Sequence, residues 1–463
     1  MRPAAIFVLM VVCIEATGAE LAPGVDQLVS TLLTQHPEAL AAQSRTQQAE
    51  GRRSVADAAF DLRVAQTTDI RSSGYYDGRV ADQRMVQPLK PLNAEVFGAY
   101  RISDGSFPVY EQEYQTLDDG EVSLGVKISL LQNRDTDPRR LELENSAWHY
   151  QEAASRQLLD VNKLVYRGVS AWLNWYQSTL KRAVVAELLA LTENRLDAIQ
   201  QRVDSGDLAS ITLTEFRTTL LQRTVLLQEA DRAEAQARDR LAYFMVGSDA
   251  EGYAVSGLLE APSDIGWPYR IALGEGAIDW SDQINDHPGL LALEAKGQQL
   301  EVDQRLARNE LLPELDLEMK IAQDFGSGPD SLDGTDSIIA LSFEVPIGVR
   351  AAKARAAIAA AATREVDYQY QVVSAQILRD LEVSLTALRF NQQILATSQH
   401  QESLALKLLA QEQIRFNEGE SDQFILISRE KSALEAQIKT IDATIDKLRN
   451  ELLIHATLAR LAA

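Results

Sequence analysis

The sequence contains almost no cysteine, and its histidines lack the spacing of a metal site. The single cysteine, Cys13, lies in an apolar run near the N-terminus, and the five histidines are scattered through 463 residues. One cysteine cannot form an internal disulfide, and metal sites need ligands at short, regular spacings. We therefore expect no disulfide, no metal and no cofactor.

Basic residues are also scarce. The chain has 45 lysines and arginines against 67 aspartates and glutamates, which gives a formal net charge of −22. Nucleic-acid binding needs a basic surface, so we expect no nucleic-acid partner. The sequence also lacks a phosphate-binding glycine loop and a Gly-x-Ser-x-Gly nucleophile motif. These absences predict a protein that is not an enzyme.

Long apolar runs are confined to the N-terminus, and even that run is too short to span a membrane as a helix. Residues 1–19 begin with a basic residue, continue as an apolar stretch and end in Thr17-Gly18-Ala19, which is typical of a secretory signal peptide. A lipid anchor on Cys13 is the alternative to cleavage after Ala19. Val12 argues against it, because lipoprotein signals place a small residue before the cysteine. The sequence predicts an exported protein without a helical membrane anchor.

What the sequence does contain is a repeated helical hairpin. After residue 413 a helix approaches Gly419, turns, and restarts after Asp422, and after residue 201 the same layout surrounds Gly206. Apolar residues on the later returning helix alternate at spacings of four and three, which is the pattern of a coiled-coil seam. These residues are Leu434, Ile438, Ile441, Ile445, Leu448 and Leu452.

The repeat extends beyond the hairpins. His36-Pro37 and His287-Pro288 each begin a shorter helix, with histidine in the capping position and proline in the first turn. Long helices are predicted at 138–204 and 351–418, and at 1.5 Å per residue each would be roughly 100 Å long. The predicted organisation is a first repeat over residues 20–247, a linker over 248–280 and a second repeat over 281–463.

Between each short helix and its long hairpin, the apolar spacing changes from helical to alternate. Four stretches of about ten residues show this change, near residues 60–70, 122–130, 315–321 and 339–347. Their length and pattern are those of tilted membrane-crossing strands with one apolar and one polar face. The residues expected to face lipid include Leu124, Val126, Leu317, Leu341 and Phe343.

A soluble antiparallel sheet with one face in water shows the same alternation. Four strands per chain cannot close a membrane barrel, which needs about eight, so a barrel would be shared between subunits. The segment from Ser72 to Gly120 is interpreted as a long loop whose aromatic side chains pack on one another as an outer cap. The predicted fold class is mainly α with a small β part.

The ordered set of these features resembles the TolC family of outer-membrane efflux proteins. It comprises short helices with His-Pro starts, two strands per repeat, and two hairpins whose tips carry an arginine followed by a glycine. The resemblance covers nearly the whole chain after the signal. It implies a homotrimer that shares a twelve-strand β-barrel in the outer membrane, continued through the periplasm by a twelve-helix barrel of coiled-coil hairpins. It also implies a periplasmic adaptor protein and, through it, an inner-membrane pump or ABC exporter.

By the same resemblance, the hairpin tips contact the adaptor. The residues that match the family's tips are Arg202 and Gly206 in the first repeat, and Arg415 and Gly419 in the second. A glycine between two helices also serves as a left-handed turn residue whatever its partner is. The sequence leaves both interpretations open.

The chain departs from the family near the second tip. Well-known members carry acidic residues six and nine positions after the second tip glycine, where they narrow the pore, but Ile425 and Ser428 stand there in this chain. Acidic residues gather closer to the tips instead, at Asp204, Asp207, Glu418, Glu420 and Asp422. Threefold symmetry would arrange them around the periplasmic mouth as a ring that favours cations. A solvated acidic surface, or a face toward basic groups of the adaptor, are the alternatives.

Two classes of function follow from these observations. The first is a passive outer-membrane exit duct of a tripartite efflux or type I secretion system, which would extend from the outer membrane into the periplasm of a Gram-negative cell envelope. The second is an exported periplasmic coiled-coil scaffold without a membrane barrel, which leaves the membrane-length strands unexplained. The sequence favours the duct and does not distinguish small-molecule efflux from protein secretion.

Overall fold

The computed structural model describes residues 24–245, 267–271, 284–345 and 347–461. The expected signal peptide with Cys13 lies outside these residues, as does the expected linker apart from residues 267–271. The chain divides into two compact units. Unit 1 comprises Met1–Ala42, Leu158–His287 and Ala375–Ala463, and unit 2 comprises Gln43–Gln157 and Pro288–Ser374. Each unit takes segments from both halves of the sequence, so neither coincides with one predicted repeat.

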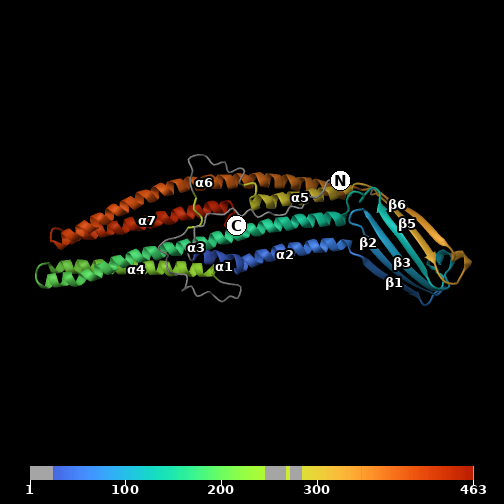
Figure 1. Cartoon of the computed structure of the whole chain (residues 1–463), viewed down its shortest axis with the longest axis horizontal. Helices are drawn as coiled ribbons and strands as arrows, with labels where there is room; N and C mark the ends of the chain where they lie inside the picture. Colours follow the sequence, from blue (N-terminus) through green and yellow to red (C-terminus); the bar gives the residue numbers. More distant parts are fainter. Residues whose placement is uncertain (1–23, 246–266, 272–283, 346, 462–463) are drawn as a thin grey trace. The chain divides into compact units, whose positions relative to one another are not determined.

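The predicted helices are confirmed (Figure 1). Within the described ranges, no helix combines the length and apolar character that crossing a membrane requires. The α-helices are α1 (Val25–Thr34), α2 (Pro37–Asp57), α3 (Pro138–Asp204), α4 (Ser210–Tyr243), α5 (Pro288–Asn309), α6 (Arg350–Asn417) and α7 (Gln423–Thr457).

The start of α2 depends on His36, as the sequence predicts. The Glu38 backbone N–H donates to Nδ1 of His36 over 3.2 Å, which satisfies one of the free donors at the helix start. Burial lowers the pKa of His36, because an imidazolium would lose its hydration there. The neutral ring keeps a lone pair on Nδ1, which accepts the hydrogen bond from the Glu38 N–H. Burial also lowers the pKa of His287, which precedes α5 in the same way.

The core of unit 1 lies where α1, α3, α4 and α7 meet. Leu28, Leu173, Leu241 and Leu452, one from each helix, are almost completely buried in it. The predicted seam of α7 faces this packing, since four of its residues are buried and Ile438 and Ile441 are half-buried. Aromatic residues of α3 also lie in the core, namely Trp172, Trp175 and Tyr176.

Unit 2 contains one six-stranded sheet in which every neighbouring pair is antiparallel. The expected number of four strands per chain is therefore wrong. The four predicted strands are present, and the segment interpreted as a long loop supplies two more. The strands are β1 (Arg63–Arg71), β2 (Gly78–Pro88), β3 (Ala94–Gly105), β4 (Glu121–Ser129), β5 (Glu314–Asp324) and β6 (Thr335–Glu344).

Strands β2 and β3 were missed because their alternation is weak. Polar residues such as Arg79 and Gln83 stand on the face of β2 that is apolar in β4 to β6, while Val86 stands on the other face. Glycine and alanine also interrupt the apolar positions of β3. The expected aromatic packing is present only around the turn after β1, where Tyr75, Tyr76, Phe107 and Tyr110 contact one another.

A buried ion network ties the two helical hairpins of unit 1 together. Glu430 of α7, whose side chain is 1% exposed, accepts hydrogen bonds from Arg195 of α3 and from Arg223 of α4. Arg223 also donates to the hydroxyl of Thr192. Arg195 lies eleven positions before Gly206, and Glu430 lies eleven positions after Gly419. The network therefore joins the hairpins at matching heights below their turns, which Figure 1 shows at the same end of the unit.

Removing Glu430 should strongly destabilise unit 1. Glu430→Ala would leave two arginines without their carboxylate in a buried position, at a cost of about 3–5 kcal/mol in the free energy of unfolding. Glu435→Ala, on the same helix, removes the exposed half of the Lys431–Glu435 pair and should cost about 0.5 kcal/mol or less. Chemical denaturation of the purified protein measures both values. Similar losses for the two variants would contradict a structural role of the network.

Candidate functional site

The first hairpin tip is held by its backbone. The carbonyl of Arg202 accepts hydrogen bonds from the backbone N–H groups of Asp207 (2.9 Å) and Leu208 (3.2 Å). Gly206, which lies between Arg202 and Asp207, has φ +84°. Glycine adopts this left-handed conformation without strain because it has no side chain. Ser205 adds a side-chain hydrogen bond to the same carbonyl. The arginine and the glycine thus end α3 together.

The second tip repeats this turn. The carbonyl of Arg415 accepts from the N–H of Glu420 over 2.8 Å, and Gly419 has φ +80°. Asp422 caps α7, since its carboxylate accepts from the N–H of Ile425 over 2.9 Å. The guanidinium of Arg415 lies 3.7 Å from Glu412 and also donates to the carbonyl of Glu420. Both tip glycines therefore have a structural reason, and the Arg415 side chain also bonds within its turn, while the side chains of both arginines remain exposed.

The five predicted acidic residues all lie at these turns and are exposed. Two of them have local partners, because Asp204 accepts from Gln200 over 2.9 Å and Asp422 is the cap of α7. Asp207, Glu418 and Glu420 have no side-chain partner among the described residues. The tips therefore present negative charge to whatever they face.

Each tip also exposes a large apolar residue that sequence reasoning missed. Ile211 is 60% exposed and Phe424 is 81% exposed. Each stands five positions after its tip glycine, so the two are equivalent in the repeat. Aligning the two tips on their glycines would have found these residues. Both returning helices have an apolar residue at this position of the first turn, and the spacing of the coiled-coil seam does not account for it. Single exposed apolar residues are common on protein surfaces, so it is their equivalence in the two tips that makes Ile211 and Phe424 candidates for a contact surface.

The predicted lipid-facing residues lie on one face of the sheet. The strand register places Leu124 opposite Ile321, Val126 opposite Met319, Leu317 opposite Leu341 and Leu315 opposite Phe343. Leu124, Leu341 and Phe343 are each more than 60% exposed, although all three are strongly apolar. Such a face is unfavourable in water and favourable against lipid.

The other face of the same strands carries charges in pairs. Glu121 of β4 contacts Arg101 of β3 over 2.5 Å and Lys320 of β5 over 2.9 Å. Nearer the opposite end of β4, Lys127 contacts Asp316 over 2.9 Å. This face is therefore suited to water, so strands β4 to β6 have one surface for each solvent. Among the described residues, no group of three or more potential ligands is placed to hold a metal ion.

Comparison with known proteins rests on structure. No protein-family model matches the chain, and no curated protein matches its sequence. Solved structures do match. The outer-membrane channel OprN is 18% identical, with a TM-score of 0.68 over 95% of this chain and 91% of that chain. The outer membrane protein VceC of Vibrio cholerae is 14% identical, with a TM-score of 0.66 over 94% and 96%.

The open state of the Neisseria gonorrhoeae MtrE outer membrane channel gives the same result. It is 15% identical, with a TM-score of 0.65 over 94% of this chain and 89% of that chain. These matches cover nearly the full length of each protein, so they include the helical hairpins as well as the sheet. The chain has the fold of these outer-membrane channels.

Proposed function

We propose that the protein is a passive exit duct of the outer membrane, part of a tripartite efflux or type I secretion system. The observation that carries this proposal is the two-faced sheet, which exposes leucine, isoleucine and phenylalanine on one side and ion pairs on the other. In a shared barrel, the apolar face contacts lipid and the charged face lines a water-filled lumen. The fold of the solved channels supports the same function.

The proposal includes a homotrimer in the outer membrane that extends into the periplasm. The hairpin tips then contact a periplasmic adaptor, which links the duct to an inner-membrane pump or ABC exporter. Arg202, Gly206, Arg415 and Gly419 shape the contact surface, while Ile211 and Phe424 supply its apolar area. The acidic residues of the tips surround the mouth and attract cations, including basic side chains of the adaptor.

The assignment of the two faces is tested by two neighbouring substitutions in β6. Leu341→Arg places a charge on the lipid face, where arginine costs about 2–4 kcal/mol near the membrane midplane. We expect this variant to fail to assemble in the outer membrane. Ser342→Arg points to the lumen and should assemble normally. Fractionation of membranes with quantification of the assembled oligomer measures both, and equal assembly of the two variants would reject the assignment.

The adaptor contact is tested at the second tip. Gly419→Trp adds a large side chain where the position of a Cβ atom has no neighbour within 4 Å, so the hairpin has space for it, while the left-handed φ of +80° adds local strain. Export should be lost while the oligomer and its membrane location persist. Gly419→Asn is the matched control, because asparagine tolerates the left-handed conformation and adds little bulk. Normal export by the tryptophan variant would show that the tip does not dock.

A further inference from the structure

The sheet of unit 2 ends in two bare edges. Strands β1 and β6 are its first and last strands, and neither has a strand on its outer side among the described residues. Every residue of both strands is exposed. Free backbone N–H and C=O groups along an edge bind another strand readily, and in lipid they cannot be left unpaired.

The two edges fit each other. Because all five pairings between the six strands are antiparallel, β1 and β6 run in opposite directions. Strand β6 of one copy can therefore pair with β1 of the next copy antiparallel, in the same manner as every other pair. The two strands also match in length, with nine residues in β1 and ten in β6. The occupant of each edge is thus a second copy of this chain.

We propose that β6 of one subunit pairs with β1 of the next in the register that sets Arg63 opposite Glu344 of the neighbouring copy. All nine residues of β1 then have a partner. The same register sets Arg71 opposite Asp336 on the charged face, and Val64 opposite Phe343 on the apolar face. A shift of two residues in either direction keeps the faces matched but separates both charge pairs.

Three of the four charges at this junction are available for such pairing. Arg63, Asp336 and Glu344 are exposed and make no ion pair with another residue that the structure describes. Arg71 lies over the ring of Tyr76 and 3.7 Å from Glu111, at the end of its strand. Basic residues at both ends of one edge and acidic residues at both ends of the other give the junction its charge complementarity.

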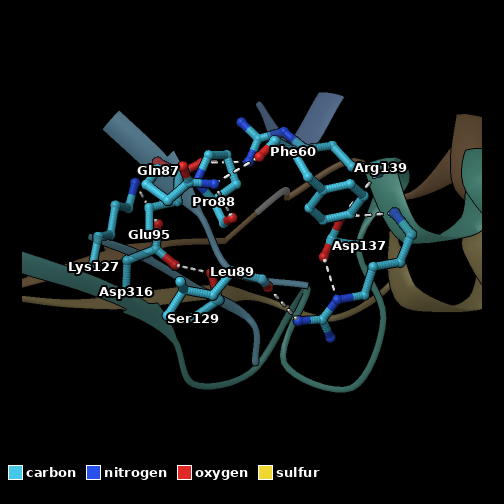
Figure 2. A network of polar contacts seen from close by, with 11 residues as sticks. Phe60, Gln87, Pro88, Leu89, Glu95, Lys127, Ser129, Asp137, Arg139 and Asp316 are labelled. Atoms are coloured by element: carbon cyan, nitrogen blue, oxygen red, sulfur yellow. Dashed lines mark hydrogen bonds and ion pairs between the residues drawn. The ribbon is translucent and has the colours of Figure 1, made fainter. Parts of the chain in front are cut away.

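The added strands β2 and β3 belong to the same wall. Their turn is fixed to the neighbouring helices, because Lys90 contacts Asp57 of α2 over 2.6 Å and Glu95 contacts Arg139 of α3. Figure 2 shows Glu95 and Arg139 together with Gln87, whose amide donates to the carbonyl of Phe60 over 2.7 Å. The base of the hairpin is therefore held by contacts to α2, to α3 and to Phe60.

Strand β3 is also fitted to β4 through a side chain. The ring of Phe97 covers Gly125 so closely that a Cβ atom there would lie 2.3 Å from its Cζ atom. If β3 were not paired with β4 in the sheet, Gly125 would lose the contact with the Phe97 ring.

Given the trimer of the proposed function, six strands per subunit make a closed wall of eighteen strands instead of twelve. Barrel diameter grows roughly linearly with strand number, and barrels of about 16–18 strands enclose an open aqueous channel. The outer-membrane section of this duct would then be wide enough to stay open without a separate gate.

The junction is tested by disulfide formation between subunits. Ala65→Cys combined with Ser342→Cys places two small side chains opposite each other on the lumen face. Mild oxidation of isolated outer membranes should give linked dimers and closed trimers on a non-reducing gel. Ala65→Cys combined with Ala340→Cys is the control, since a diagonal pair lies about 7–8 Å apart and exceeds the reach of a disulfide. We expect the control to yield about tenfold less product. Each single variant checks for reaction with Cys13.

The outcomes separate the junction from the proposed function. Efficient linkage of the control with little of the first pair would overturn the register. A trimer in the outer membrane that links in neither variant would overturn the edge pairing and leave the duct intact. A soluble monomer would reject the duct itself. An electron-microscopy reconstruction of the trimer then counts strands directly, and a wall of twelve would overturn the inclusion of β2 and β3.

Discussion

The structure of unit 2 depends on one requirement: the N–H and C=O groups of the backbone must form hydrogen bonds wherever water is excluded. A sheet with one apolar face cannot stand in water, and a sheet with two open edges cannot stand in lipid. The charged face, with Glu121 between Arg101 and Lys320, excludes burial of both faces in lipid as well. In the proposed duct, a closed wall with water inside and lipid outside satisfies all three conditions. One chain supplies part of that wall, so the proposal requires an assembly.

Unit 1 meets a different constraint, because its helices are too long to gain stability from one compact core. The α7 seam from Leu434 to Leu452 has the spacing that keeps a partner helix in contact along its length. Apolar packing of this kind has little directional specificity. Glu430, held by arginines from two other helices, supplies the specificity, because its carboxylate has full hydrogen bonding only when the two hairpins are at matching heights.

Sequence reasoning found the helices because their signals are strong and repeated. Pro37, Pro288, Gly206 and Gly419 mark boundaries that the structure keeps, and the α7 seam has the predicted burial. It missed β2 and β3 because Arg79 and Gln83 break the alternation on which strand prediction depends. It also missed the Glu430 network, whose members are far apart in the sequence and look like ordinary charged residues on helix surfaces. The tip glycines were found, but Ile211 and Phe424 were not, because single apolar residues stand out only when the two repeats are aligned.

The segment between β1 and β4 adds two strands to the sheet. Because this number is even, the first and last strands of the sheet still run in opposite directions. One extra strand would make β1 and β6 parallel, so that the edge of one copy could no longer pair antiparallel with the edge of the next. A hairpin restores the original direction of the chain, so β1 after α2 and β4 before α3 keep their directions. In the proposed assembly, inserting an even number of strands keeps the junction antiparallel while the circumference of the barrel increases. Under the proposed assembly, a barrel gains width by whole hairpins without a change in the order of its helices.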